Sequence, residues 1–588
     1  MLTIAKPAAR PREWPEQPYK GLSYYEPDDA PLFAGRKGDV VKCAELLTRP
    51  ATRILFLHGP TGCGKSSFLR AGLIPFLEEE DIGIGFLKDA RGERLKSIFV
   101  RATGKPLVEL AKKVCDFART DILIKSPLGE TYPLGLPDTL GGLGEAEFIE
   151  RASGEPEFLI ERLGEIAERL PKSLVLIVDQ GEEVFTLKPD KQEGGSQYRY
   201  GRHARNFFRF LDLFSRSRFD LKLLIALRTE YYGRFCGKMQ QTQVFSPNVV
   251  QYMLDNLSKE QIVEAIRLPT SETNEGFGAP YKHYHFEYEG GLPEIIADEL
   301  LSKKLAGGIL PVMQVVCDTL YKTTKAAQGT SKPWKISEGV YRSLGSIEDQ
   351  VEKSLDATFG QLCKKNGITS DADVQKETER WKDLLSELAG SQSDGTVTTD
   401  VKSEEELKAI AEKSRCRLDF VKTMRHLADD KVRVLRYTEF VDTRNACVLR
   451  YSLGHDAIGL VLHRWKVTRK EVADSVAIMR SRLRVGGWVL MVLGLLLVIL
   501  ALKLKYAGWD DQWAWFISLM LGIYGFTLVA VSYMPRPTLF NQFFYWVVVA
   551  YLPFIPKKSL ERMIQQREFQ SLLRLNPHLL AQVQKRLG

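Results

Sequence analysis

The chain has 588 residues, of which 44% are hydrophobic and 27% are charged. These proportions exclude a wholly disordered protein, and the length predicts about three or four domains. The net charge of +8 is mild for this length and gives only weak support for contact with anionic lipid or nucleic acid. The eight cysteines form no C-x-x-C pair, which excludes a zinc ribbon or a disulfide framework and favours a reducing compartment.

The first residues, 1–18, are rich in proline and charge. Because they contain no apolar core segment, they are not a secretory signal, and we expect a flexible arm. A helix is predicted over residues 37–47, directly after the turn Phe33-Ala34-Gly35-Arg36.

The strongest pattern of the chain lies between residues 54 and 67. An apolar run, 54–57, predicts a buried strand, and residues 66–77 predict the helix that follows a glycine-rich turn. The turn fits G-x-x-x-x-G-K-[ST], in which backbone N–H groups and a helix N-terminus surround the phosphates of a nucleotide. Lys65 would reach the β- and γ-phosphates, and Ser66 would bind Mg²⁺. The predicted nucleotide-binding residues of the turn are Gly59, Pro60, Thr61, Gly62, Cys63, Gly64, Lys65, Ser66 and Ser67.

Two further apolar strands end in residues that suit phosphate chemistry. The run 173–179 ends at Asp179, where a carboxylate lies beside Mg²⁺ in such sites. Glu182 and Glu183 follow, and on their own they can be the N-terminal charges of a helix. The run 222–227 ends at Arg228, and the carboxyl end of a central strand is where α/β sheets bind ligands. Arg228 can therefore reach the γ-phosphate, or it can form a surface ion pair with Glu230.

The second half of the chain up to residue 465 is mostly helical. Ser258 and Gln261 form a capping box that begins a helix, and Pro311 opens another helix in its first turn. Between residues 335 and 465, several amphipathic helices precede two alternating runs, 432–437 and 446–453, which predict a hairpin and, with the helices, a winged helix. His455 follows at once; a single histidine of this kind is most often structural.

Taken in order, these motifs resemble the STAND class of signal-transducing P-loop ATPases, and specifically its bacterial branch called novel STAND. The resemblance rests on Tyr-x-Gly-Leu at 19–22, Phe-x-Gly-Arg at 33–36, Asp-Gln-x-Glu-Glu at 179–183, the Gly-x-Pro turn before residue 312 and Gly454-His455-Asp456. Gly454 stands where related motifs have methionine. The resemblance implies that Gly35, Arg36 and Pro311 contact the adenine, that Glu182 or Glu183 polarises the attacking water, that Arg228 senses phosphate, and that His455 touches the β-phosphate of ADP.

The C-terminal part contains long uncharged runs. Residues 485–502 and 512–534 are each about long enough to cross a bilayer as a helix, and they predict a transmembrane hairpin. A third run, 538–556, is aromatic and contains prolines, so it can span, re-enter or lie in the interface. Basic residues flank the spans on the side of the ATPase, which predicts a multi-pass protein of the inner membrane with its ATPase domain in the cytoplasm.

The sequence thus predicts an α/β P-loop NTPase core of the AAA+/STAND type with a helical lid, a winged-helix domain and C-terminal transmembrane helices. The expected segments are the arm (1–18), the nucleotide-binding domain (19–250), the lid (251–350), the winged helix (351–470), the transmembrane region (485–556) and a basic cytoplasmic tail (557–588). The expected cofactors are ATP or ADP and Mg²⁺. The expected partners are a lipid bilayer, further copies of the chain and an unidentified trigger, without a specific nucleic-acid contact.

The leading functional hypothesis is a slow ATPase that acts as an ADP/ATP switch. On activation it would oligomerise and act through its transmembrane hairpin, in anti-phage defence or stress signalling. One alternative is a membrane-anchored scaffold or regulator with a separate effector. Another is an AAA-type motor that acts on membrane proteins.

Overall fold

The computed structural model divides the chain into two compact units, residues 1–463 and 464–588. The structure describes the following residues: 14–79, 98–102, 105–119, 123–125, 131–133, 135–170, 173–185, 202–241, 248–274, 278–303, 308–329, 332–391, 397–429, 432–441, 447–506, 523, 526 and 529. Residues 1–13 of the predicted arm (1–18) therefore lie outside the described residues.

A five-stranded sheet forms the centre of the first unit, and all its neighbouring strands are parallel. Its strands in spatial order are β2 (Phe99–Arg101), β5 (Leu174–Asp179), β6 (Leu221–Arg228), β1 (Ile54–Gly59) and β7 (Val249–Met253). Strands β1, β5 and β6 confirm the three predicted apolar runs. All six residues of β1 and of β5 are buried, as expected for strands that are covered on both faces.

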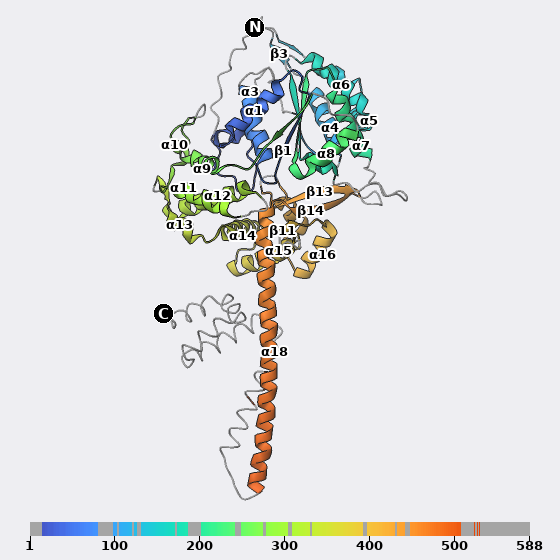
Figure 1. The fold of residues 1–588 in the computed structure, drawn as a ribbon. Coiled ribbons are helices and arrows are strands. Elements are labelled where there is room, and N and C mark those ends of the chain that lie inside the picture. Colours follow the sequence, from blue (N-terminus) through green and yellow to red (C-terminus); the bar gives the residue numbers. More distant parts are fainter. Residues whose placement is uncertain are drawn as a thin grey trace. The chain divides into compact units, whose positions relative to one another are not determined.

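Helices cover both faces of this sheet (Figure 1). Alternate residues of one strand point to opposite faces, so Ile54 and Phe56 join one hydrophobic cluster while Leu55 and Leu57 join another. The first cluster is completed by α4 (Pro106–Arg119), α5 (Glu145–Gly154), α6 (Pro156–Arg169), α7 (Arg202–Ser215) and α8 (Thr229–Gln241). The second is completed by α1 (Lys37–Thr48), by a π-helical turn (Phe68–Leu73) that continues the short helix α2 (Lys65–Ser67), and by α3 (Ile74–Glu79).

The Gly/Pro-rich segment 127–144, which by its composition reads as a surface loop, is more ordered than that. Two short strands, β3 (Leu123–Lys125) and β4 (Thr131–Pro133), precede the 3₁₀ helix η3 (Leu136–Leu140). Leu136 and Leu140 are buried in the first cluster, so η3 is part of the core.

A second layer of helices follows the sheet and has its own hydrophobic cluster. Its elements are α9 (Lys259–Arg267), α10 (Tyr281–Tyr284), β8 (Phe286–Tyr288), α11 (Leu292–Ser302), α12 (Ile309–Gln328), β9 (Trp334–Ile336) and α13 (Glu338–Ser343). The capping box at the start of α9 is confirmed, because Ser258 and Gln261 exchange side-chain and backbone hydrogen bonds. Tyr19 belongs to this cluster, and its hydroxyl donates to the Ile266 carbonyl over 2.6 Å.

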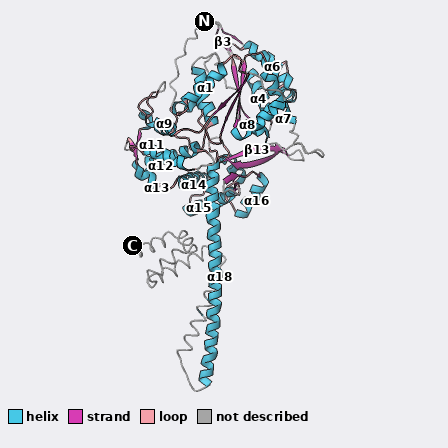
Figure 2. Cartoon of the chain, viewed as in Figure 1, coloured by secondary structure: helices cyan, strands magenta, loops and turns pink. Residues whose placement is uncertain are grey.

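Residues 347–463 contain most of a third hydrophobic cluster, and we call this segment the hairpin module. Its elements are α14 (Ile347–Lys365), α15 (Asp371–Ser386), β10 (Ala389–Ser391), β11 (Val397–Thr399), β12 (Lys402–Ser403), α16 (Glu404–Ser414), α17 (Phe420–Leu427), β13 (Leu435–Val441), β14 (Cys447–Leu453) and the start of α18. The predicted hairpin is confirmed: β13 and β14 pair antiparallel, with Tyr437 opposite Tyr451 (Figure 2).

The expected membrane location is wrong. The first predicted span, 485–502, continues the single helix α18 (Asp456–Tyr506), whose earlier turns carry charged residues such as Arg464, Lys466 and Arg469. The prediction counted uncharged residues and did not foresee this continuity. Within the described ranges, no helix is both long enough and apolar enough to cross a membrane. The other two predicted segments and the basic tail, 512–588, lie outside the described residues except for Ile523, Phe526 and Val529.

Candidate functional site

The glycine-rich turn after β1 has the geometry of a phosphate loop. Gly62 and Gly64 have φ angles of +75° and +89°, which side chains rarely adopt, so glycine is needed at both positions. A Cβ atom at Gly59 would collide with the carbonyl oxygen of Leu254. The Nζ atom of Lys65 donates to the carbonyls of Gly59 (2.7 Å) and Pro60 (2.9 Å), which places the ammonium group inside the loop.

The residues predicted to hold Mg²⁺ lie side by side. Ser66 Oγ donates to Asp179 Oδ2 over 2.7 Å, and Asp179, at the end of β5, is only 4% exposed. The backbone N–H of Gln180 donates to the other carboxylate oxygen over 2.9 Å and fixes its orientation. One hydroxyl and one carboxylate at the end of a phosphate loop are the oxygen ligands that Mg²⁺ takes in such sites, so the residues fit the ion.

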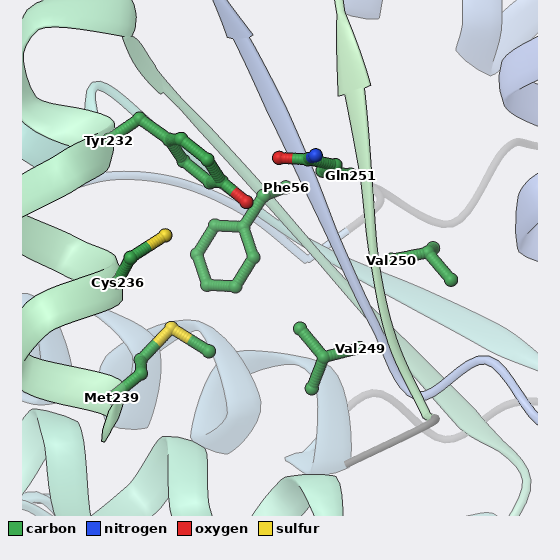
Figure 3. A pocket seen from close by; sticks show the side chains of 7 residues that line it. All are labelled: Phe56, Tyr232, Cys236, Met239, Val249, Val250 and Gln251. Atoms are coloured by element: carbon green, nitrogen blue, oxygen red, sulfur yellow. The ribbon is translucent and has the colours of Figure 1, made fainter. Parts of the chain in front are cut away.

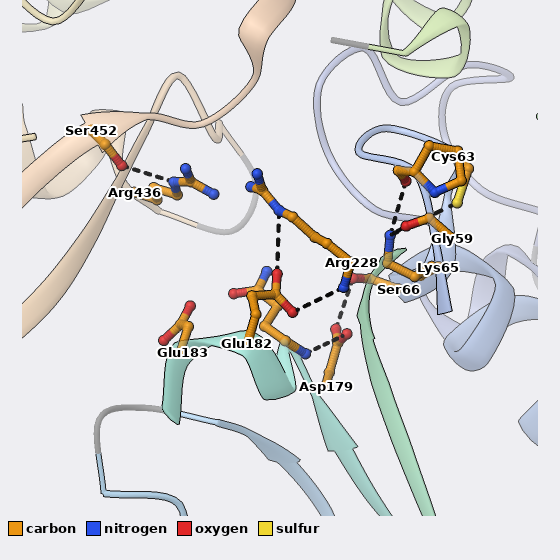
Figure 4. A network of polar contacts seen from close by, with 12 residues as sticks. Gly59, Cys63, Lys65, Ser66, Asp179, Glu182, Glu183, Arg228, Arg436 and Ser452 are labelled. Carbon is orange, nitrogen blue, oxygen red and sulfur yellow. Dashed lines mark hydrogen bonds and ion pairs between the residues drawn. The ribbon is translucent and has the colours of Figure 1, made fainter. Parts of the chain in front are cut away.

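The two glutamates of the 3₁₀ helix η4 (Gly181–Phe185) have different surroundings (Figure 4). Glu182 lines the cleft beside the phosphate loop, and its carboxylate pairs with Nε of Arg228 over 3.3 Å. It also accepts the backbone N–H of Arg228 over 3.3 Å. Glu183 is not among the residues that line the cleft and pairs with Arg101 over 3.5 Å. Burial, only partly offset by Arg101, raises the pKa of Glu183 to about 7.

A single cleft connects these groups and encloses about 1160 Å³, including its open mouth. The lining combines two kinds of surface. Polar and charged groups come from the phosphate loop, Asp179 and Arg228, and apolar side chains come from Leu22, Phe33, Ala34, Leu257, Ala265, Leu310, Pro311 and Met313. Polar groups beside apolar surface suit a nucleotide, whose phosphates and base need these two environments.

The predicted Gly35-Arg36 turn borders this cleft and braces the phosphate loop. Arg36 is 4% exposed, and its guanidinium donates to the carbonyls of Cys63 (2.9 Å) and Asp255 (2.6 Å). Gly35 has a φ angle of +77°, and a Cβ atom there would come within 2.9 Å of the Gln261 carbonyl oxygen. The turn therefore joins the phosphate loop to α9.

The turn that contains Pro311 lies directly on the phosphate loop. Gly308 precedes α12 with a φ angle of +83°, and a Cβ atom there would lie 2.6 Å from Gly62 Cα and 2.7 Å from the Thr61 carbonyl oxygen. Pro311 lines the cleft one turn further on. No side chain fits at Gly308, so the start of α12 and the phosphate loop touch through their backbones.

The hairpin module supplies the opposite wall of the cleft. His455 Nε2 lies 3.1 Å from the carbonyl oxygen of Leu22, and burial, followed by the charge of Arg433, lowers the pKa of His455 to about 3. A Cβ atom at Gly454 would collide with the carbonyl oxygen of Arg433, which explains why glycine replaces methionine at this position. His455 thus shares one cleft with Lys65 and Arg228.

Tyr24, Gly308, Arg433 and Arg436 are among the residues of this site that sequence reasoning did not assign to it. Arg433 lies just before β13 and Arg436 lies within it, and an arginine on a hairpin has no motif of its own. Gly308 did carry a signal, since it begins the turn that contains Pro311. Tyr24 follows the Tyr-x-Gly-Leu motif closely, although its partner in the cleft could not be identified from the sequence.

A second hollow lies between β1, β7 and α8, away from the phosphate loop (Figure 3). It is lined by Phe56, Tyr232, Cys236, Met239, Val249, Val250 and Gln251. None of these side chains carries a formal charge at neutral pH, so this hollow is poorly suited to phosphates.

Comparisons with known proteins agree with the site. A family model described as Novel STAND NTPase 1 matches residues 18–487. The comparison with curated proteins gave no match. Among solved structures, a Walker-type ATPase of Pyrococcus abyssi is 16% identical with a TM-score of 0.32, covering 75% of this chain and 98% of that chain. The ORC2 protein of Aeropyrum pernix, in ADPNP and ADP complexes, is 12% identical with a TM-score of 0.31, covering 74% and 95%. Drosophila ORC bound to DNA is 13% identical with a TM-score of 0.28, covering 78% and 96%. Structural likeness at such TM-scores carries no argument.

Proposed function

The chain belongs to the novel STAND NTPase family, and on this premise we propose that it is a nucleotide switch that exchanges ADP for ATP and hydrolyses ATP slowly. The observation that carries the proposal is the convergence of Lys65, Arg228 and His455 on one cleft. These residues come from the sheet and from the hairpin module, so a nucleotide between them would link the two. Such a link is what a switch needs.

Different residues of the cleft bind different parts of the nucleotide. Lys65 and the N–H groups of the phosphate loop bind the phosphates, while Ser66 and Asp179 hold Mg²⁺, which when bound neutralises charge on the β- and γ-phosphates. The apolar part of the lining, which includes Pro311, receives the adenine.

Glu182 orients the attacking water, because it lines the cleft whereas Glu183 does not. In the structure Glu182 pairs with Arg228 instead. Hydrolysis then requires Arg228 to turn from Glu182 to the γ-phosphate, and this requirement makes turnover slow.

In this structure the hairpin module contacts the N-terminal segment, and we take this arrangement to be the resting form. The bond from His455 to Leu22 and the stacking of Arg433 on Tyr24 hold the hairpin module, which we take to be a winged helix, against the N-terminal segment. Replacement of ADP by ATP would release this module and expose surfaces through which copies of the chain associate. We further propose that this event serves anti-phage defence or stress signalling, a role that the family resemblance favours.

The test is to identify the nucleotide that the full chain retains through purification and to measure its mass by light scattering before and after exchange for a slowly hydrolysed ATP analogue. The switch predicts retained ADP and a larger particle after exchange. A chain that binds neither ADP nor ATP would refute the proposal. Fast steady hydrolysis without retained ADP would favour the motor instead.

A further inference from the structure

The hairpin wall of the cleft carries two arginines to which the proposed function assigns no contact with phosphate. Arg433 and Arg436 line the cleft together with Gly454 and His455. Counted over the whole lining, five cations, Arg36, Lys65, Arg228, Arg433 and Arg436, stand against two carboxylates, Asp179 and Glu182. The lining thus has an excess of positive charge, to which both the phosphate-loop side and the hairpin module contribute, and this excess suits a polyanion.

Neighbouring groups orient both arginines. The guanidinium of Arg433, whose backbone φ angle is +51°, lies 3.4 Å above the ring of Tyr24. Arg436 Nε donates to Ser452 Oγ over 2.8 Å, and these two residues are opposite each other in the β13–β14 pair. In Figure 4 the guanidinium of Arg436 reaches from the hairpin toward that of Arg228. Two cations that approach each other in this way are stabilised when an anion lies between them.

His455 is poorly suited to contact a phosphate in this arrangement. The Leu22 carbonyl can only accept, so Nε2 of His455 must carry the hydrogen. The lowered pKa keeps the ring neutral at pH 7, and a neutral imidazole has one N–H only. Its Nδ1 atom then has a lone pair, which phosphate oxygens repel.

We propose that Arg433 and Arg436 are the residues through which the hairpin module binds the terminal phosphates of a nucleoside di- or triphosphate, while His455 positions the segment Tyr19–Tyr25 beside them. This inference rests on the proposed function, because it requires a nucleotide in the cleft. It differs from the expectation that His455 itself contacts the β-phosphate. How tightly the hairpin module is held at the cleft then depends on how many phosphates the bound nucleotide carries.

The test compares the binding of adenosine, AMP, ADP and ATP to the full chain and to its variants R433Q and R436Q by calorimetric titration. We expect each variant to bind ADP and ATP at least about tenfold more weakly, as for loss of one charge-assisted hydrogen bond, and to bind adenosine as the unmodified chain does. The matched control is R425Q, because Arg425 is exposed on α17 of the same module and does not line the cleft. It should change nothing.

The variant K65A separates the two proposals. If K65A loses ATP binding while R433Q and R436Q both bind ATP like the unmodified chain, this inference is overturned and the proposed function stands. If K65A binds ATP normally, the proposed function itself fails. An equal loss for adenosine and ATP in R433Q and R436Q would mean that the arginines only maintain the fold. The lysine variants R433K and R436K keep the charge, and recovery of ATP binding in them would support direct phosphate contact.

Discussion

The two walls of the cleft are built in different ways. The phosphate loop is one continuous turn between a fully buried strand and a helix, and Arg36, α9 and Gly308 brace it from outside. The hairpin wall reaches the N-terminal segment through side chains, with His455 on Leu22 and Arg433 on Tyr24. Each such contact contributes only about 1 kcal/mol. The wall with the phosphate loop is therefore rigid enough to bind the phosphates of a nucleotide. The hairpin wall is held weakly enough to move when the nucleotide changes.

Replacing Lys65 by alanine removes the cation of the rigid wall and has the largest expected effect. We predict a loss of ATP and ADP affinity of about 100-fold or more, because two phosphates lose their main charge partner. Titration with a fluorescent ADP analogue measures it. K42A is the control, since Lys42 is exposed on α1. Comparable affinity in K65A and K42A would contradict the distinction between the walls.

Replacing Glu182 by glutamine tests where hydrolysis occurs. We predict that kcat for ATP falls about 100-fold in E182Q with ADP binding retained, because the carboxylate that orients water is lost. E183Q is the matched control and should change kcat less than about twofold, since Glu183 faces Arg101 outside the cleft. Steady-state phosphate release distinguishes the two variants, and a reversed order would move the catalytic role to Glu183.

Replacing His455 by alanine weakens the contact between the hairpin wall and the N-terminal segment. We predict that ADP dissociates about tenfold faster, as for loss of one buried hydrogen bond, while H426A on α17 leaves the rate unchanged. Stopped-flow release of a fluorescent ADP analogue measures the rate.

The pH dependence of that rate is a second test of His455. The folded protein favours its neutral ring, so the stabilisation is complete above about pH 6.5 and is lost as the pH falls toward 3. Release from the unmodified chain should therefore speed up between pH 7 and pH 5, and release from H455A should not. A pH-independent rate in the unmodified chain would argue against a role of the contact between His455 and Leu22 in holding ADP.

The smallest expected effect concerns stability. The pKa of Glu183 is raised to about 7, so its charged form is disfavoured in the folded state, and this cost grows as the pH rises from about 4.5 through 7. We predict that E183Q is more stable than the unmodified chain by about 1–3 kcal/mol at pH 8.5 and no more stable at pH 4.5. Thermal unfolding at the two pH values measures the difference, and a constant difference would indicate another cause.

The sequence predicted the rigid wall well, because its chemistry is local. Spacing identified β1 and the glycine turn, since a phosphate loop needs its residues at fixed positions along the chain. The apolar run of β5 indicated the carboxylate at its end, Asp179. The hairpin wall depends on contacts between distant segments. Leu22 and His455 are more than four hundred positions apart, and no periodicity predicts that they meet.

Two differences between the sequence predictions and the structure have clear physical reasons. The replacement of methionine by Gly454, which weakened the motif match, follows from the carbonyl of Arg433, which leaves no space for a side chain. The predicted span 485–502 failed because an uncharged run does not show where its helix begins; here the helix begins at Asp456, among charged residues.

The backbone contact between Gly308 and Gly62 has a mechanical consequence. Because no side chain separates the two backbones, a displacement of the phosphate loop on nucleotide exchange would also move Gly308 and, with it, the start of α12. That helix has 20 residues and is therefore about 30 Å long. A small tilt at its start therefore produces a larger displacement at its far end.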